Sequence, residues 1–169
     1  MQAEVVKTFD ADVLQNILSI ERSSFPKAWI YDKAEEYYGR MLSAKANINI
    51  LLTETGQKIG YLLAIPHNDA VKDLSSDDPK MEGDLLKYYI ETIAIRAEYR
   101  GKKGFSILLG KLIEECKKRG IHKISMHARV SNHLSEIIQK KLAITEIRRI
   151  EKWAYYNFEE PTDYIEATI

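Results

Sequence analysis

The sequence predicts a mixed α/β or α+β domain, and three observations lead to that class. The stretch Leu85–Gly120 changes from a strand pattern to a helical pattern, as a strand–helix crossover requires. The elements expected along the chain follow the order β, α, α, β, β, β, α, β, α, β, β. The chain has 169 residues, 45% of them hydrophobic, so it can bury one sizeable core. We therefore expect a single domain over residues 1–169.

The N-terminal part predicts a short strand followed by two helices. Val5–Thr8 has the strand pattern, and Asp10 or Asp12 offers an N-cap for the first helix. This helix is expected to end near Ser23–Pro26, because proline disfavours helical geometry at the residue before it. The loop between the two helices then spans Ser24–Tyr31.

The middle of the chain predicts a hairpin, a loop and a strand–helix pair. Asn47–Thr53 and Lys58–Ile65 are strand-like and are joined by a short turn. His67–Gly83 is polar, mostly acidic and without an apolar period, so we expect a long surface loop there. Tyr88–Ile95 is rich in β-branched and aromatic residues, whereas the apolar residues of Phe105–Gly120 recur at helical spacing.

A basic, glycine-containing segment, Arg100–Gly104, lies between this strand and this helix. The first amides of a helix are donors without an intrahelical partner, and they attract anions such as phosphate. Two glycines alone would also fit an ordinary strand-to-helix turn. The position and the positive charge of the segment favour phosphate binding.

Polar and apolar residues alternate along the predicted strand Ile121–Val130. Because a helix links it to the previous strand, we expect the two strands to be parallel, and a parallel sheet usually buries both faces. A polar row on such a strand indicates either an edge open to water or the wall of a site. His127 is the candidate for that site, with a hydrogen-bonded structural imidazole as the alternative. The row comprises Lys123, Ser125, His127 and Arg129.

The C-terminal part predicts one more helix and two more strands. Ser131 and Asn132 offer a cap for a helix whose apolar residues run to Leu142. The final strands are expected at Ile147–Phe158 and Asp163–Ile169, separated by turn residues.

The composition argues against several classes of protein. Basic and acidic side chains number 25 each, so the formal net charge is zero, whereas a nucleic-acid binder is usually basic. A nucleic-acid patch around Arg100, Lys102 and Lys103 therefore has little support. Cys116, the single cysteine, is expected to be a buried thiol on the apolar helix face. The chain shows no apolar run of ~20 residues, no signal-peptide pattern and no metal-ligand spacing of its histidines, so we expect a cytoplasmic protein without membrane or metal contacts.

Two pieces of sequence carry a resemblance to a known family. The first is Glu91–Ile95 followed by Glu98–Gly101 and the helix that starts at Phe105, and the second is Arg129–Asn132 before the helix that ends at Leu142. With an element order that matches over nearly the whole chain, they resemble the GNAT superfamily, the N-acetyltransferases that use acetyl-coenzyme A. The resemblance implies a mixed, partly splayed central sheet flanked by helices, with the pantetheine of the cofactor in the gap.

A third piece, Ser24–Pro26 with Trp29 after it, is similar to the first helix–loop of the N-terminal protein acetyltransferases. In those enzymes this loop helps to hold the N-terminus of the substrate. The resemblance ranks a peptide N-terminus above a small polyamine or a lysine side chain as the acceptor. The substrate-binding residues that it implies are Phe25, Pro26, Trp29 and Tyr31.

The resemblance also assigns contacts to acetyl-CoA. Strand backbone groups would bond the pantetheine, the loop would hold the pyrophosphate, and an asparagine would help to position the cofactor. The family loop reads Arg/Gln-x-x-Gly-x-Gly/Ala, and its small positions fall on Gly104 and Ser106 when the loop is counted from Gly101. The residues so assigned are Ile93, Ala94, Ile95, Arg100, Gly101, Lys102, Lys103, Gly104, Phe105, Ser106 and Asn132.

Three residues are candidates for catalysis. Glu91 falls where many members of the family carry a glutamate that removes a proton from the amine, and His127 falls where some relatives place their base. Either group suits a general base, because the attacking amine must lose its proton. Tyr89 is a candidate assistant, with a core aromatic as the alternative. Gln139 stands where many relatives have the tyrosine that protonates the leaving thiolate, so the general acid is unassigned.

The leading hypothesis is an N-acetyltransferase, monomeric or homodimeric, in which an amine attacks the thioester of acetyl-CoA directly. Placing both reactants in one cleft would supply much of the catalysis. The irregular loop and Gln139 motivate an alternative from another class, a non-catalytic module that binds an acyl-CoA or a protein partner.

Overall fold

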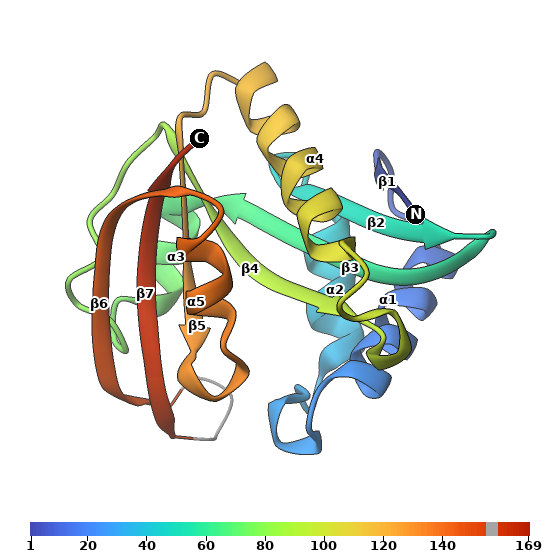
Figure 1. The fold of residues 1–169 in the computed structure, drawn as a ribbon, viewed down its shortest axis with the longest axis horizontal. Helices are drawn as coiled ribbons and strands as arrows, with labels where there is room; N and C mark the ends of the chain where they lie inside the picture. The colour runs from blue at the N-terminus through green and yellow to red at the C-terminus, as the bar shows by residue number, and fades with distance from the viewer. Residues whose placement is uncertain (155–158) are drawn as a thin grey trace. The chain divides into compact units, whose positions relative to one another are not determined.

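The computed structural model describes residues 1–154 and 159–169 (Figure 1). The strands within this part of the chain follow the order β1-β2-β3-β4-β5-β7-β6, and most neighbours are antiparallel. The chain divides into two compact units, Met1–Ala64 with Thr92–Glu115 and Ile65–Glu91 with Cys116–Ile169. The mixture of strands and helices confirms the predicted α/β class.

The first unit is built on antiparallel strands with helices on both faces. β2 pairs with β1 on one side and with β3 on the other. The elements are β1 (Gln2–Val5), α1 (Ala11–Ser24), η1 (Lys27–Trp29), α2 (Ala34–Ser43), β2 (Ile48–Glu54), β3 (Gln57–Pro66), the C-terminal end of β4 (Lys87–Ile95), η2 (Ala97–Tyr99) and most of α4 (Gly104–Lys118).

The register of β2 and β3 shows which helix covers which face. Leu52 lies opposite Gly60, so both positions face the same side of the sheet. A Cβ on Gly104, at the start of α4, would lie 2.9 Å from Leu52 Cδ2, which places α4 on that side. Tyr61 follows Gly60 and points to the other side, where its hydroxyl lies 3.1 Å from that of Tyr38 on α2. Helices α4 and α2 therefore cover opposite faces (Figure 1).

Helix α1 follows the predicted signals. Asp10 is its N-cap and accepts a hydrogen bond from the amide of Asp12 at 2.8 Å. The helix ends at Ser24, because Phe25 is already extended before Pro26. Its buried face consists of Leu14, Ile17, Leu18, Ile20 and Glu21.

The second unit contains a sheet of four strands together with two helices. β7 lies between β5 and β6 and is antiparallel to both, while β5 is parallel to β4 (Figure 1). The elements are α3 (His67–Leu74), the N-terminal end of β4, β5 (Lys123–Arg129), η3 (Val130–Asn132), α5 (Leu134–Gln139), β6 (Ala143–Trp153) and β7 (Glu160–Thr168).

Strands β4 and β5 pair only over a short stretch. The paired residues run from Lys87 opposite Lys123 to Tyr89 opposite Ser125. On its other side β5 stays paired with β7 as far as Arg129. The early end of the β4–β5 ladder agrees with the partly splayed sheet that the resemblance implies.

His67–Gly83 is not the open surface loop that the sequence predicts. Its first part, His67–Leu74, forms α3, and His67, Asp78 and Met81 are buried. The segment packs partly through polar side chains, so a search for an apolar period does not detect it.

Two predicted boundaries in the chain differ from the structure because pairing and packing set the ends of elements. β1 is Gln2–Val5, where it pairs with β2, and the predicted strand Val5–Thr8 is wrong. α5 ends at Gln139 and not at Leu142, since the chain enters β6 soon afterwards.

The last two strands begin earlier than the sequence predicts. β6 begins at Ala143 and β7 at Glu160, ahead of the predicted starts at Ile147 and Asp163, because the two strands pair with each other over nearly their whole length. The predicted strand end at Phe158 lies outside the described residues.

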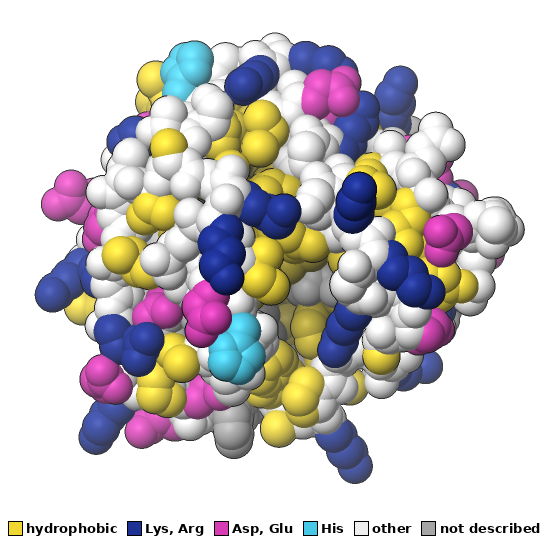
Figure 2. All heavy atoms as spheres, in the orientation of Figure 1, with side chains coloured by type: hydrophobic (Ala, Val, Ile, Leu, Met, Phe, Trp, Pro, Cys, Tyr) yellow, Lys and Arg dark blue, Asp and Glu magenta, His cyan; other side chains and the backbone are white. Residues whose placement is uncertain are grey.

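The surface shows no sorting of charge on the face drawn in Figure 2, where basic and acidic side chains are interspersed. Within residues 1–154 and 159–169, no helix is long and apolar enough to cross a membrane. The same residues contain no group of three or more His, Cys, Asp or Glu that could hold a metal ion. Cys116 is buried, as predicted.

Candidate active site

The predicted cofactor loop, in the first unit, turns sharply before α4. Gly101 and Lys103 have φ values of 75° and 66°, in the left-handed region that favours glycine. The amide of Ile107 bonds the carbonyl of Lys103 at 3.1 Å, which leaves the amides of Gly104–Ser106 without an intrahelical acceptor. These amides fit an anionic group such as a pyrophosphate. The helix start at Gly104 supports counting the loop from Gly101.

Two glycines let this loop and the end of β4 lie close to neighbouring strands. A Cβ on Gly104 would meet Leu52 Cδ2 at 2.9 Å and Ile95 Cδ1 at 3.1 Å. A Cβ on Gly60 of β3 would lie 2.8 Å from the carbonyl oxygen of Ala94, closer than side chains tolerate. The predicted pantetheine-binding stretch, Ile93–Ile95, is therefore held in place by direct backbone packing.

Arg100 bonds backbone carbonyls on two sides. Its Nη2 donates to the carbonyl of Ser24 at 2.6 Å, and its Nε donates to the carbonyl of Ile95 at 3.1 Å. Lys102 Nζ lies 5.2 Å from the ring centroid of Tyr99. The guanidinium of Arg100 thus joins the end of β4 to the end of α1.

The predicted acceptor residues lie between α1 and α2. Phe25 and Trp29 are half-buried, with ring centroids 6.1 Å apart, and Pro26 precedes the short helix η1. Tyr31 packs against Tyr37 of α2, with ring centroids 4.3 Å apart. The structure thus brings Phe25 and Trp29 together, while Tyr31 faces α2.

One face of the sheet in the second unit is polar, and the strand register explains which side chains meet. Ser125 of β5 lies between Tyr89 of β4 and Glu166 of β7. His127 lies opposite Tyr164, which in turn lies opposite Arg148 of β6. Alternation puts all these side chains on one face. The polar row predicted on β5 is therefore part of a wider polar surface.

His127 is the centre of a buried hydrogen-bonded chain on that face. Its Nδ1 lies 2.9 Å from the Tyr89 hydroxyl, and its Nε2 lies 3.0 Å from Asp78 Oδ2. The side chains of His127 and Asp78 are each 2% exposed. Arg148 donates to the same oxygen of Asp78. The Trp153 ring stacks on the imidazole with centroids 4.1 Å apart and planes at 17°.

The protonation of this chain follows from the charges around it. Burial alone would raise the pKa of Asp78, but the hydrogen bonds from His127 and Arg148 outweigh it and lower that pKa to about 2. Asp78 is therefore a carboxylate, so the proton of His127 lies on Nε2 and Nδ1 accepts from Tyr89. Burial lowers the pKa of His127 below its ordinary value of 6.5, against the smaller opposing effect of Asp78. His127 is neutral at pH 7.

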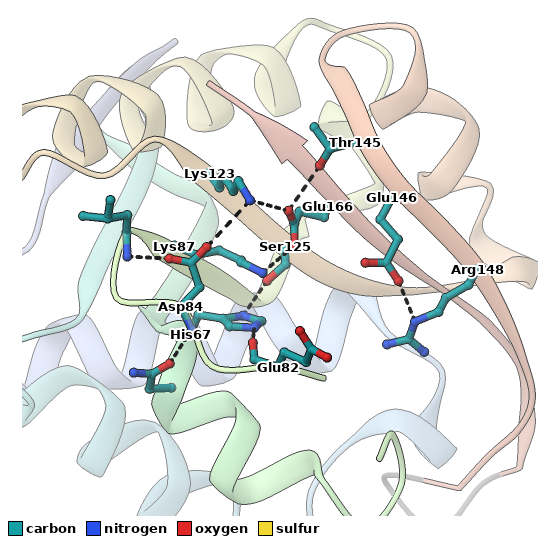
Figure 3. Close-up of polar contacts among 12 residues, drawn as sticks. His67, Glu82, Asp84, Lys87, Lys123, Ser125, Thr145, Glu146, Arg148 and Glu166 are labelled. Carbon is teal, nitrogen blue, oxygen red and sulfur yellow. Dashed lines mark hydrogen bonds and ion pairs between the residues drawn. The ribbon is translucent and has the colours of Figure 1, made fainter. Parts of the chain in front are cut away.

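A second histidine lies on the same face (Figure 3). His67, at the start of α3, places its Nδ1 2.8 Å from Ser125 Oγ and its Nε2 3.1 Å from the carbonyl oxygen of Glu82. Next to it, Lys87 and Glu166 form a buried ion pair, which Lys123 extends at 3.1 Å. Burial, and then the nearby charge of Lys87, lower the pKa of His67 to about 4.

Three more residues that the sequence analysis considered for the site are Glu91, Asn132 and Gln139. Glu91 is half-buried and follows Tyr89 by two positions, so alternation along β4 puts both on one side. Asn132 Oδ1 accepts from the amide of Leu134 at 2.8 Å and so begins α5. Gln139 Nε2 donates to Ser135 Oγ at 3.2 Å. Neither of the last two side chains carries a group that titrates near neutrality.

Sequence reasoning missed four residues around His127. Asp78 is one of several carboxylates in a segment interpreted as a surface loop, and nothing local separates it from the others. Trp153 and Tyr164 contact the imidazole, and Arg148 bonds Asp78, through strand pairing that a single sequence does not reveal. The polar row on β5 was the one signal that such partners exist.

The mixed fold and the glycine-containing loop at the start of α4 agree with the acetyl-CoA-dependent acyltransferases that the sequence resembles. The family model of the acetyltransferase (GNAT) family matches residues 14–136. The chain belongs to the GNAT family. It is an N-acetyltransferase that uses acetyl-CoA.

Individual relatives agree with this assignment. The chain is 26% identical over 140 residues, 82% of this chain and 79% of the relative, to a putative [ribosomal protein bS18]-alanine N-acetyltransferase of Bacillus subtilis (strain 168). The crystal structure of the ribosomal-protein-S18-alanine N-acetyltransferase from Escherichia coli is similar with a TM-score of 0.68 at 17% identity, over 99% of this chain and 94% of that one.

An aminoglycoside 6'-N-acetyltransferase complexed with coenzyme A has the same fold. Its TM-score is 0.71 at 12% identity, over 99% of this chain and 97% of that one. At these identities the solved structures show the fold alone.

Proposed function

We propose that this N-acetyltransferase acts on the α-amine of a protein or peptide N-terminus. Similarity to a bS18-alanine N-acetyltransferase over 82% of the chain supports a protein acceptor. The half-buried aromatics Phe25 and Trp29, in the loop that resembles the acceptor loop of N-terminal acetyltransferases, support it as well.

The observation that carries the choice of amine is the neutral, buried His127 bonded to Tyr89. A base whose pKa is lowered below 6.5 is a weak proton acceptor. It is better matched to an α-ammonium group, with a pKa of about 8, than to a lysine ammonium, with a pKa of about 10.4. A polyamine presents amines of the lysine kind. The base therefore favours an N-terminus.

We assign Tyr89 and His127 jointly as the proton acceptor. In this assignment the amine would give its proton to the Tyr89 oxygen, directly or through one water, as the phenol proton moves to Nδ1 of His127. Glu91 lies on the same side of β4 and would favour the cationic amine electrostatically before its proton is lost.

The cofactor assignments follow the backbone of the first unit. The amides of Gly104, Phe105 and Ser106 would hold the pyrophosphate, with Gly101, Lys102 and Lys103 shaping and charging the loop. Ile93, Ala94 and Ile95 would bond the pantetheine. Acetyl-CoA supplies the thioester that the deprotonated amine attacks. The side chains of Arg100 and Asn132 bond backbone groups of the protein. In this assignment they position the backbone near the cofactor and do not bond the cofactor themselves.

A competition assay tests the acceptor. The protein and acetyl-CoA are combined with a peptide that has a free α-amine, with the same peptide Nα-blocked but carrying a lysine, and with spermidine, and thiol release is measured. We expect kcat/KM at least about tenfold higher for the free α-amine. Equal or better turnover of the blocked peptide or of spermidine overturns the proposal. Binding of acetyl-CoA without thiol release on any amine would favour the non-catalytic module.

The cytoplasmic location, the single-domain organisation and the monomeric or homodimeric state remain predictions.

A further inference from the structure

We propose that Asp78 is a positioning residue for the acetyl transfer. It fixes His127 with the proton on Nε2, keeps Nδ1 open to the Tyr89 proton, and stabilises the imidazolium that forms. The inference rests on the proposed roles of Tyr89 and His127.

The geometry is that of a carboxylate, an imidazole and a hydroxyl in sequence. Asp78 Oδ2 to His127 Nε2 is 3.0 Å, and His127 Nδ1 to the Tyr89 oxygen is 2.9 Å. All three side chains are at least nine-tenths buried. The same logic, with a serine in place of the tyrosine, activates the nucleophile of serine proteases. In this chain the terminal hydroxyl would accept a proton from a substrate instead.

The charged groups near His127 act in two directions. Asp78 and Asp77, from the segment after α3, favour the imidazolium, while Arg148 of β6 opposes it. Arg148 also donates to Asp78 and is held by Glu146 at 2.9 Å, so it keeps Asp78 ionised. Tyr164 of β7 and Trp153 of β6 enclose the imidazole with ring centroids at 5.2 and 4.1 Å.

The proton balance of the step is simple. The amine gives one proton to the Tyr89 oxygen while the Tyr89 proton moves to Nδ1. The neutral amine nitrogen then forms a bond to the acyl carbon, and the C–S bond breaks. The nitrogen loses its second proton as the amide forms, and the leaving sulfur takes up that proton to depart as a thiol. One positive charge remains on His127, next to the Asp78 carboxylate, in place of the charge that the ammonium group brought. Without Asp78, the buried imidazolium would face Arg148 without a carboxylate bonded to it, which burial makes costly.

The rings of Trp153 and Tyr164 hold the imidazole of His127 in one orientation. The tautomer of His127 then decides whether Nδ1 accepts or donates a hydrogen bond. A carboxylate is an acceptor only, and it therefore determines the tautomer. A neutral amide at position 78 would retain an acceptor oxygen but lose the charge.

The first experiment reads the tautomer directly. Ring nitrogen shifts of ¹⁵N-labelled protein at pH 7.5, assigned with His127→Gln, should show His127 protonated on Nε2 and bare on Nδ1. A proton on Nδ1 overturns the inference. This measurement needs no variant of Asp78 and is independent of any loss of folding.

The second experiment is kinetic. Asp78→Asn should lower kcat by about tenfold to 10²-fold, with KM for the amine and Kd for acetyl-CoA within about threefold of wild type. The acid limb of the kcat–pH profile should move to lower pH, because Asp78 raises the pKa of His127. A merely structural carboxylate would not move that limb.

A matched control and the remaining outcomes complete the design. Asp73→Asn makes the same charge change on an exposed position of α3 and should leave kcat unchanged. A folded Asp78→Asn variant with wild-type kcat and an unmoved limb overturns the inference. The assays use whichever amine the wild-type protein acetylates fastest. If that amine is not an N-terminus, the proposed function fails while the role of Asp78 is still tested.

Discussion

His67 and His127 lie on the same polar face of the second unit, and they differ in the group that bonds Nε2. Both are buried, both use their two ring nitrogens, and both have a lowered pKa. The Nε2 of His67 faces the backbone carbonyl of Glu82, whereas the Nε2 of His127 faces the carboxylate of Asp78. Glu166 and Asp84 act on His67 only through their charge, against that of Lys87, whereas a carboxylate bonds His127 directly. Burial and a perturbed pKa therefore do not distinguish the two histidines, and the bonded partner does.

Replacing each histidine gives the largest expected difference. His127→Ala should lower kcat by about 10²- to 10⁴-fold, the usual contribution of general base catalysis, with Kd for acetyl-CoA nearly unchanged. His67→Gln should keep kcat within about threefold, because the ring nitrogens of His67 bond Ser125 and a backbone carbonyl and not a group assigned to catalysis. Steady-state kinetics on the preferred amine and calorimetry with acetyl-CoA measure both. If kcat fell equally in His127→Ala and His67→Gln, the proposed difference in role between the two histidines would be wrong.

The same comparison predicts how stability depends on pH. The pKa of His67 is about 4 in the folded protein and about 6.5 in the unfolded chain, so the unfolded state binds more protons between these values. The contribution of His67 to the unfolding free energy is fully present above pH 6.5. It is lost as the pH falls to 4 and amounts to about 3 kcal/mol. Urea unfolding at pH 7, 5.5 and 4.5 measures the slope.

His67→Gln should flatten that slope, since glutamine does not titrate. The slope that remains in the variant belongs to the other groups with a shifted pKa, among them His127, Asp78 and Glu166. If the unfolding free energy of His67→Gln depended on pH as that of the wild type does, the pKa of His67 would be the same in the folded and unfolded states. His67 and His127 would then no longer share a lowered pKa.

Several boundaries of helices and strands could be predicted from local signals in the sequence. The helix cap at Asp10 and the helix end before Pro26 depend on neighbouring residues only, and both predictions are confirmed. The change from strand to helix around Gly101 also depends on local chemistry, although the exact loop register needed the structure.

The candidate site followed only in part, because its contacts join distant segments. Alternation marked His127 as unusual, yet Asp78 lies 49 positions away in sequence and Tyr89 lies 38 away. The segment of α3 and the residues after it packs partly through His67 and Asp78, so it shows no apolar period. Long-range pairing of polar groups is the part of a fold that a single sequence shows least.

A smaller effect is expected from the hydroxyl that supports His67. Ser125→Ala removes the donor to Nδ1 and leaves a buried acceptor unpaired, which should cost about 2 kcal/mol of unfolding free energy. Ser131→Ala, which removes an exposed hydroxyl bonded to Glu160, is the matched control and should cost well under ~1 kcal/mol. Urea unfolding at pH 7 measures both. A cost as small as that of the control would mean that His67 does not rely on Ser125.

The smallest expected effect sharpens the role of the other candidate base. Glu91 lies on the same side of β4 as Tyr89, and if the Tyr89–His127 pair takes the proton, Glu91 adds only a favourable field for the amine. Glu91→Gln should then lower kcat several-fold, about 1 kcal/mol, with acetyl-CoA affinity intact. Tyr89→Phe should cost much more. The reverse order, with a loss of 10²-fold or more in Glu91→Gln and a mild Tyr89→Phe, would make Glu91 the base and leave His127 as a second structural histidine beside His67. The double variant Glu91→Gln with Tyr89→Phe shows whether the two side chains act on one proton. If they serve the same step, the loss of kcat in the double variant is smaller than the two separate losses combined.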